Sequence, residues 1–262
     1  MRREEEQVAD WGDAAAYAPL LEADRSLFAW EWLRRVPDYR EAAARSGATG
    51  VDRSGTIIAD ERAARWGLHT FERSNLAGPD ARPIWRREVC PSVLSARAAD
   101  EGEAEERFDL RRLRIGAAVV RSRSGIEHVL LSDRGRRLRL DIVSGTICNG
   151  PVLLRFELAG MRSMVRPLLT LRQVVALWRA GRFSRALHPL ETGAARWILL
   201  LRTHDALAAG ADQREIAERL LDRDAAWPRW RVKAPALRSR AQRLVREARR
   251  MAAGGYLSLL RP

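Results

Sequence analysis

The chain has 262 residues, 46% of them apolar, so it can form two compact domains or one large one. Its formal net charge is +13, but Lys233 is the single lysine among 47 basic residues, and so strong an arginine bias reflects GC-rich coding. The distribution of charge is therefore more informative than its total. Residues 1–99 carry 15 basic and 16 acidic groups, whereas residues 161–262 carry 21 and 8. A localised basic excess is typical of a protein that binds a polyanion.

Neither secretion nor membrane insertion is expected. The two cysteines, Cys90 and Cys148, are far apart, as in reduced cytosolic proteins. The first residues, MRREEEQVAD, lack the apolar region of a signal peptide, and no apolar run approaches the ~18 residues of a membrane span. We expect a cytoplasmic protein without membrane contact.

Residues 1–97 predict an N-terminal helical module. Apolar residues recur at helical spacing over 13–36, which predicts a helix there, and Pro37 predicts its end. Trp30 and Trp32 cannot share one helix face, so we expect one of them to dock against another domain or a subunit. The predicted elements are a helix over 13–36, a loop over 41–56, a short helix over 59–67 and an extended loop over 75–91.

An acidic linker, AADEGEAEER, is predicted at 98–107, followed by a small antiparallel sheet within 108–160. Turn signals such as Asn149-Gly150 separate short strand-like runs. In one run, leucine and isoleucine alternate with arginine and aspartate over 137–142, which predicts one buried face. The strands of this meander are predicted at 114–120, 126–132, 136–143 and 152–158.

Residues 161–262 predict a basic, all-α, helix-turn-helix-like DNA-binding domain, which makes the fold class α+β. Asp212 can cap a helix while Glu215 bonds back to it. The next gap, 222–234, exceeds the usual turn of about 3–4 residues. Either the last helix is the recognition helix after an extended turn, or a short helix near 223–231 intervenes; an ordinary helical bundle is the alternative. Helices are predicted over 170–180 (with Thr170 as N-cap), 194–209, 213–221 and 236–252.

The predicted helix at 236–252 has a narrow apolar side, and six arginines occupy most of the rest, with Glu247 as the single acid. Six arginines repel one another unless phosphates neutralise them, so we predict contact with DNA. A solvated face and a membrane-surface helix are the alternatives; the small apolar face disfavours the latter. The predicted DNA-binding residues are Gln213, Arg214, Arg229, Arg231, Lys233, Arg238, Arg240, Arg243, Arg246, Arg249 and Arg250.

Three stretches in the last hundred residues carry a resemblance: TLRQVVALWRAGRF (170–183), ARWILLLRTHDALAAGADQREIAERLL (195–221) and LRSRAQRLVREARRMAAGGYLSLL (237–260). They resemble the RovC-type DNA-binding domain of type VI secretion transcription factors, which also occurs in the FseA and QseM excision regulators of integrative and conjugative elements. Residues 10–40 resemble the transcriptional-regulator-like module that often precedes it. The resemblance implies a transcription regulator, expected to be an activator of secretion or mobile-element genes, that oligomerises either with itself or with a partner regulator through its N-terminal module.

No enzyme motif is found: there is no P-loop, no GxGxxG and no CxxC, and the four histidines lack metal-ligand spacing. We therefore expect no catalytic residues, no cofactor and no metal, with double-stranded DNA as the partner. Two alternatives remain open. One is an antiactivator or other protein-binding regulator of the same fold, and the other is a non-catalytic recombination accessory factor.

Overall fold

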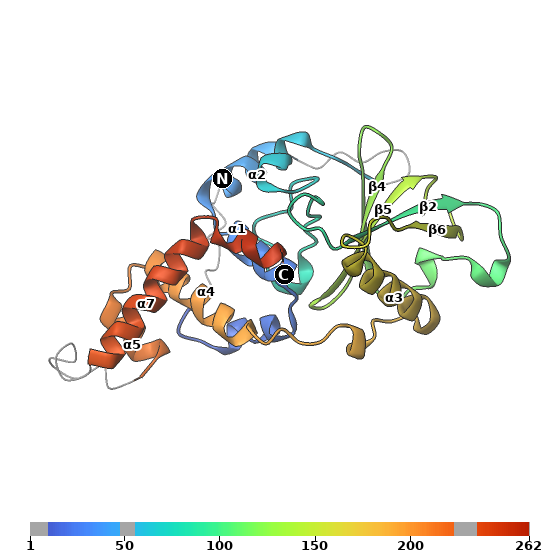
Figure 1. The fold of residues 1–262 in the computed structure, drawn as a ribbon. Coiled ribbons are helices and arrows are strands. Elements are labelled where there is room, and N and C mark those ends of the chain that lie inside the picture. The colour runs from blue at the N-terminus through green and yellow to red at the C-terminus, as the bar shows by residue number, and fades with distance from the viewer. Residues whose placement is uncertain (1–9, 48–55, 223–234, 262) are drawn as a thin grey trace.

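The computed structural model of the protein describes residues 10–47, 56–222 and 235–261. A sheet covered by α3 forms one side of the molecule, α4, α5 and α7 form the other, and α1 lies between them (Figure 1). The predicted α+β class is confirmed. The α-helices are α1 (Arg25–Leu33), α2 (Pro37–Ser46), α3 (Val165–Ala180), α4 (Ala194–Ala208), α5 (Gln213–Leu220) and α7 (Pro235–Ala252), and the longer 3-10 helices are η1 (Ala15–Glu22), η2 (Glu61–Trp66) and η8 (Gly255–Leu260).

The sheet has six strands in the order β1-β3-β4-β5-β2-β6. The predicted antiparallel meander is confirmed for β3, β4 and β5. Two further strands from before residue 108 pair in parallel, β1 with β3 and β2 with β5, so the sheet is mixed and larger than predicted. The strands are β1 (Ile57–Ile58), β2 (Val93–Ala99), β3 (Gly116–Arg121), β4 (Glu127–Asp133), β5 (Arg136–Ser144) and β6 (Leu153–Glu157).

Strand β2 also changes the neighbourhood of β6 and of the predicted acidic linker. β6 pairs with β2 instead of following β5 in the meander. Ala98 and Ala99, the first two residues of the predicted linker, are the last residues of β2 and pair with β6. The acidic residues of the predicted linker all follow this strand, and one of them, Glu101, forms an ion pair with Arg155 of β6.

Strand β5 buries both of its faces, which corrects the expectation of a single buried face. Leu138, Leu140 and Ile142 belong to the core beneath α3. Arg137, Arg139 and Asp141 face the other way, and each is less than a tenth exposed. The backbone of the preceding loop covers them: Ala81 O and Trp85 O accept hydrogen bonds from Arg137 and Arg139.

Two predicted helix boundaries are wrong, both for reasons of helix-end chemistry. Pro37 does end the preceding helix, but it also occupies the first turn of α2, where its missing N–H is not needed. The predicted single helix over 13–36 is divided into η1 and α1, and α2 fills the beginning of the predicted loop over 41–56. Thr170 is not an N-cap; it is buried inside α3 and donates to Arg166 O, because α3 begins at Val165.

The N-terminal helices share one hydrophobic core with the C-terminal helices. α1 packs against α4, α7 and η8, and the leucines and aromatic residues of α1 are fully buried there. Phe28 meets Trp197 of α4 edge-on, with ring centroids 4.9 Å apart. Trp30 and Trp32 are both buried, and Trp32 contacts His204 of α4, which confirms that one of the two docks against the C-terminal helices.

A buried ion-pair network also joins α1 to α4. Just after α1, Arg35 donates two hydrogen bonds to Asp205 of α4, at 2.7 and 2.9 Å, and Nη1 donates to both the carboxylate and the backbone carbonyl of Glu31. Tyr17 donates to Asp205 at 2.6 Å, and the Gly78 amide donates to Glu31 at 2.6 Å. Burial by itself would raise the pKa of Asp205, but its hydrogen bonds with Arg35 and the charge of Arg35 hold it below the ordinary value. Buried charged groups thus connect the N-terminal helices to the C-terminal helices.

Candidate nucleic-acid interface

Helices α4, α5 and α7 form a three-helix unit at the far side of the molecule from the sheet (Figure 1). The turn over 209–212 between α4 and α5 has the length of the about 3–4-residue turn in helix-turn-helix units. α7 packs against both α4 and α5. Ala217 and Ala241 are fully buried at the α5–α7 contact, where small side chains allow close approach.

The start of α5 is fixed by the predicted capping box. Asp212 Oδ1 accepts from the amides of Arg214 and Glu215 at 2.7 and 2.9 Å. Glu215 returns the contact by accepting from the Asp212 amide at 2.8 Å. Two of the amides that have no partner inside the helix are therefore satisfied, and the position of the first turn of α5 is defined.

Helix α7 has the two-sided character that its sequence predicts. Ala241, Leu244, Ala248 and Met251 are buried against α4, α1 and α5. The opposite side is exposed and carries all six predicted arginines: Arg238, Arg240, Arg243, Arg246, Arg249 and Arg250.

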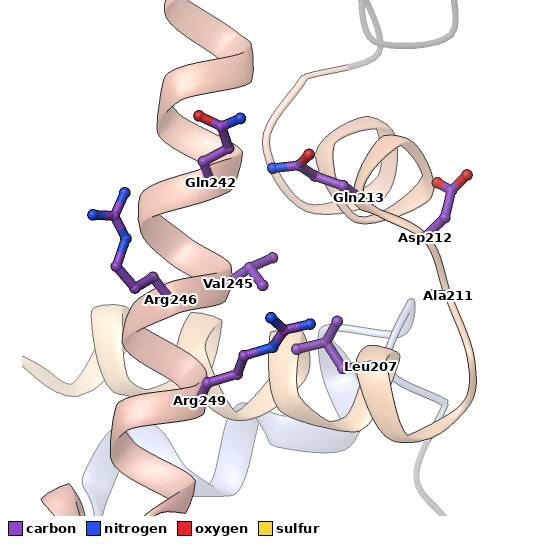
Figure 2. Close-up of a pocket in the computed structure, with 8 residues that line it drawn as sticks. All are labelled: Leu207, Ala211, Asp212, Gln213, Gln242, Val245, Arg246 and Arg249. Atoms are coloured by element: carbon purple, nitrogen blue, oxygen red, sulfur yellow. The ribbon is translucent and has the colours of Figure 1, made fainter.

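A groove lies between α7 and the turn that leads into α5 (Figure 2). Gln213 extends from α5 toward α7 and Arg249 extends from α7 toward Leu207, whereas the end of the Arg246 side chain points away from α5 (Figure 2). Gln242 lies one helical turn before Arg246 on the same wall. The complete lining consists of Leu207, Ala211, Asp212, Gln213, Gln242, Val245, Arg246 and Arg249.

The arginines of α7 differ in their acidic neighbours. Glu247 forms an ion pair with Arg196 of α4, and Arg250 approaches Glu247 to 3.8 Å. For Arg243, Arg246 and Arg249 no ion pair exists with any residue that the structure describes. These guanidinium groups are exposed cations with their hydrogen-bond donors available to a polyanion.

The structure places the predicted DNA-binding residues in three groups. Gln213, Arg246 and Arg249 are among the residues that line the groove, whereas Arg214 is exposed on the first turn of α5. Arg238, Arg240, Arg243 and Arg250 lie on the exposed side of α7 outside the groove lining. Arg229, Arg231 and Lys233 lie outside the described residues. For all of them, DNA contact stays a prediction.

Gln242 is the groove residue that the sequence analysis missed. Its position four residues before Arg246 puts both side chains on one ridge of α7, which was the available signal. Gln213 at the start of α5 is among the predicted residues, but on α7 the prediction rests on the arginines and leaves this amide out. An amide carries both a donor and an acceptor, which suits it for contact with a base edge.

The described part of the chain also bears on membrane-spanning helices and on metal sites. Within residues 10–47, 56–222 and 235–261, no helix combines the length and apolarity that a membrane crossing needs. The same described ranges contain no cluster of three His, Cys, Asp or Glu side chains arranged to hold a metal ion.

Comparisons with known proteins agree with this arrangement. Residues 160–261 match the family model described as "T6SS, Transcription factor, DNA binding domain". Residues 10–70 match the model described as "Proteobacterial transcriptional regulator-like domain". The predicted resemblance of both segments is thereby confirmed, in the predicted order. No curated protein matches the chain significantly.

Proposed function

We propose that the protein activates secretion or mobile-element genes through the face formed by α5 and α7. The chain combines a transcriptional regulator-like domain with a DNA-binding domain and is therefore a DNA-binding transcription regulator. On this proposal it acts in the cytoplasm, on double-stranded DNA. The observation that carries the assignment to this face is the groove of Figure 2, whose two arginines have no acidic partner among the described residues.

The groove residues have the chemistry of base readout. Arg246 and Arg249 can each donate two hydrogen bonds to the O6 and N7 acceptors of guanine. Gln213 and Gln242 can pair donor and acceptor with adenine. The arginines outside the groove on the same side of α7 would bind phosphates, which positions the protein without selecting sequence. In this arrangement the α4–turn–α5 segment is a helix-turn-helix unit, and α7 is the helix that supports and extends its contact surface.

The proposal is tested with the full-length protein and duplexes selected from a random-sequence library. The logarithm of the wild-type affinity should fall with the logarithm of salt concentration with a slope of about −4 or steeper, as for five or more neutralised phosphates. The double variant R246A/R249A should bind the selected duplex more weakly. R162A is the matched control, because Arg162 is an exposed arginine of the same matched domain that lies just before α3, away from the groove.

Unchanged affinity of R246A/R249A for the selected duplex would contradict the assignment of this face. The alternative of an antiactivator would then move ahead, since such a protein binds another regulator and its basic helix is dispensable. A recombination accessory factor would bind DNA in the same experiment but change excision of the element instead of promoter activity in a reporter strain.

We also propose that the regulator self-associates, and that α3 provides the surface. Four tryptophans of the N-terminal module are buried and offer little surface for a partner: Trp11, Trp30, Trp32 and Trp85. On α3 and just before it, Met161, Val165, Leu168 and Val175 are exposed at heptad spacing. Light scattering should give a mass above that of one chain for the wild type and a lower mass for L168E.

A further inference from the structure

A second cavity, of about 370 Å³, lies where the start of α1, the start of β5, the first turns of α3 and the end of η8 meet. It is separate from the groove in Figure 2, and its lining includes no described residue of α5 or α7. The volume is within the range of about 300–1,000 Å³ that is usual for small-molecule sites. Its walls come from both matched domains and from the sheet between them, so a ligand there would touch all three parts of the fold.

Arg137 of β5 is the feature of this cavity that lacks an explanation within the protein. The residue is 8% exposed, and its Nη2 donates to Ala81 O at 2.6 Å. Its Nε and Nη1 are buried without any hydrogen-bond partner. The nearest carboxylate oxygen, Asp24 Oδ1, is 3.8 Å from Nη1 and already accepts from the Leu27 amide and the Ser26 hydroxyl at the start of α1. Buried guanidinium donors left in this way cost free energy unless an acceptor meets them.

The other charged groups around the cavity leave an excess of positive charge. Glu191 is paired with Arg25 at 2.9 Å, and Glu22 lies 4.0 Å from Arg136. Arg139 is held by Asp141 and by the backbone. Arg166, in the first turn of α3, is half-buried and has no ion pair with the part of the chain that the structure describes. Two cationic side chains, Arg137 and Arg166, therefore have donors to offer to one anion.

A third polar group presents an acceptor. His188 Nδ1 lies 3.0 Å from Ser184 O, and because a carbonyl only accepts, the proton is on Nδ1. The buried Nε2 therefore has a free lone pair, and it has no partner. Burial lowers the pKa of His188, which keeps the ring neutral at neutral pH. The rest of the lining is largely apolar and includes Trp85, Leu138, Leu169, Leu259 and Leu260.

We infer that this cavity binds a small organic carboxylate with an apolar body and one hydroxyl group. The carboxylate would accept charge-assisted hydrogen bonds from one free donor of Arg137, either Nε or Nη1, because these two point to opposite sides of the guanidinium, and from Arg166. The hydroxyl would donate to His188 Nε2. The apolar body would contact the leucines and Trp85, as in most small-molecule sites.

The test is calorimetric titration of the full-length protein with 4-hydroxyphenylacetate, its neutral amide, and inorganic phosphate. Saturable binding of the acid is expected, with at least about tenfold weaker binding of the amide and of phosphate, since each lacks part of what the cavity recognises. R137M should bind the acid at least about tenfold more weakly. R166Q, at a half-exposed site, is the second variant if R137M does not fold, and it should weaken binding about three- to tenfold. R162A should bind as the wild type does.

Three results would overturn the inference. The first is the absence of saturable binding of the acid at millimolar concentrations by protein that circular dichroism shows to be folded. The second is equal affinity for the acid and its amide. The third is wild-type affinity in both R137M and R166Q, or in R166Q if R137M is unfolded.

Discussion

Arg246 and Arg250 are neighbours on the exposed side of α7, but their surroundings differ. Arg246 lines the groove and has no acidic partner among the described residues, whereas Arg250 lies 3.8 Å from Glu247. We expect R246A to lose about 1–3 kcal/mol of binding free energy for the selected duplex if the side chain reads a base edge. R250A should lose less, because Glu247 already neutralises part of its charge. Fluorescence anisotropy at constant salt measures both, with R162A as the reference for the loss of one charge.

Leu244, on the buried side of the same helix, should show the opposite behaviour. It is 8% exposed within the shared core. L244A should lower the free energy of unfolding by about 2–5 kcal/mol, because the leucine loses its contacts and leaves a cavity. R246A should change it by less than about 0.5 kcal/mol, as is usual for a surface site. Urea denaturation of both variants measures the two effects, and an equal loss in both would mean that the sides of α7 have been misassigned.

The sequence predicts the burial of a side chain correctly where local periodicity determines it. It does not predict burial that depends on a segment distant in the sequence. The helical spacing over 237–252 predicts a narrow apolar side, and the buried residues of α7 lie on that side. The alternation of β5 predicts its apolar face equally well, but a single buried face would leave Arg137 and Arg139 exposed. Those two arginines are buried because the loop around Ala81 and Trp85 crosses over them and offers carbonyl acceptors. No pattern within β5 contains that information.

The contact between α1 and α4 depends on Arg35 more than on any other charged residue. Its guanidinium holds Asp205 by two hydrogen bonds and also donates to Glu31, and all three are largely out of water. R35M should lower the free energy of unfolding by about 3–5 kcal/mol, because it leaves the buried Asp205 without its arginine and leaves Glu31 with Arg34 alone. R25M is the matched control: Arg25 pairs with Glu191 nearer the surface, and its loss should cost at most about 1 kcal/mol. Thermal unfolding of the two variants compares them, and equal losses would contradict the special role of Arg35.

Among the elements, local signals located the helices and turns, and non-local pairing was what the sequence concealed. Asp212 and Glu215 predicted the start of α5 because both partners of a capping box lie within one turn. β1 and β2 were missed because each pairs in parallel with a strand that follows tens of residues later. α2 was not predicted because Pro37 was interpreted only as the end of a helix, whereas proline also occurs in the first turn of a helix. At the candidate interface, charge pointed to the arginines of α7, but the groove and Gln242 depend on how α5 and α7 pack.

For the whole molecule, the division of the C-terminal matched domain between two cores has a direct consequence for truncation. α3 packs on the sheet, whereas α4, α7 and η8 pack on the N-terminal helices. An isolated fragment of residues 160–261 would expose both sets of contacts. We expect it to lack a cooperative thermal transition by circular dichroism, whereas the full chain shows one. A fragment that unfolds cooperatively would show that the DNA-binding domain has a sufficient core of its own.

The stability of the protein should fall in mild acid. Burial and the neighbouring ring of His128, whose centroid lies 3.5 Å from that of His69, lower the pKa of His69 to about 3. Unfolded chains take up this proton below about pH 6.5 and the folded protein does not, so stability is complete above pH 6.5 and is lost as pH falls toward 3. His188 and His204 have lowered pKa values and act in the same direction.

Urea denaturation at about pH 7.5 and about pH 5 measures this effect. His69 alone contributes at most about 1.4 kcal/mol for each pH unit. H69Q removes the titrating group and retains a polar side chain, so its stability should depend less steeply on pH than that of the wild type. If the wild type instead became more stable between about pH 7.5 and about pH 5, the buried histidines would not be the groups that control its response to acid.

The packing of α1 on η8 also governs the order in which the polypeptide can fold as it is translated. The ribosome delivers α1 early, with its leucines and tryptophans, and delivers their partners in α4, α7 and η8 only near the end of the described chain. Local helices form as they emerge, but a core built from such distant segments closes only after the last of them is free. Until then the apolar residues of α1 are accessible to chaperones and to other nascent chains. A stop codon before η8 would leave the surface of α1 that packs on η8 exposed in the finished chain.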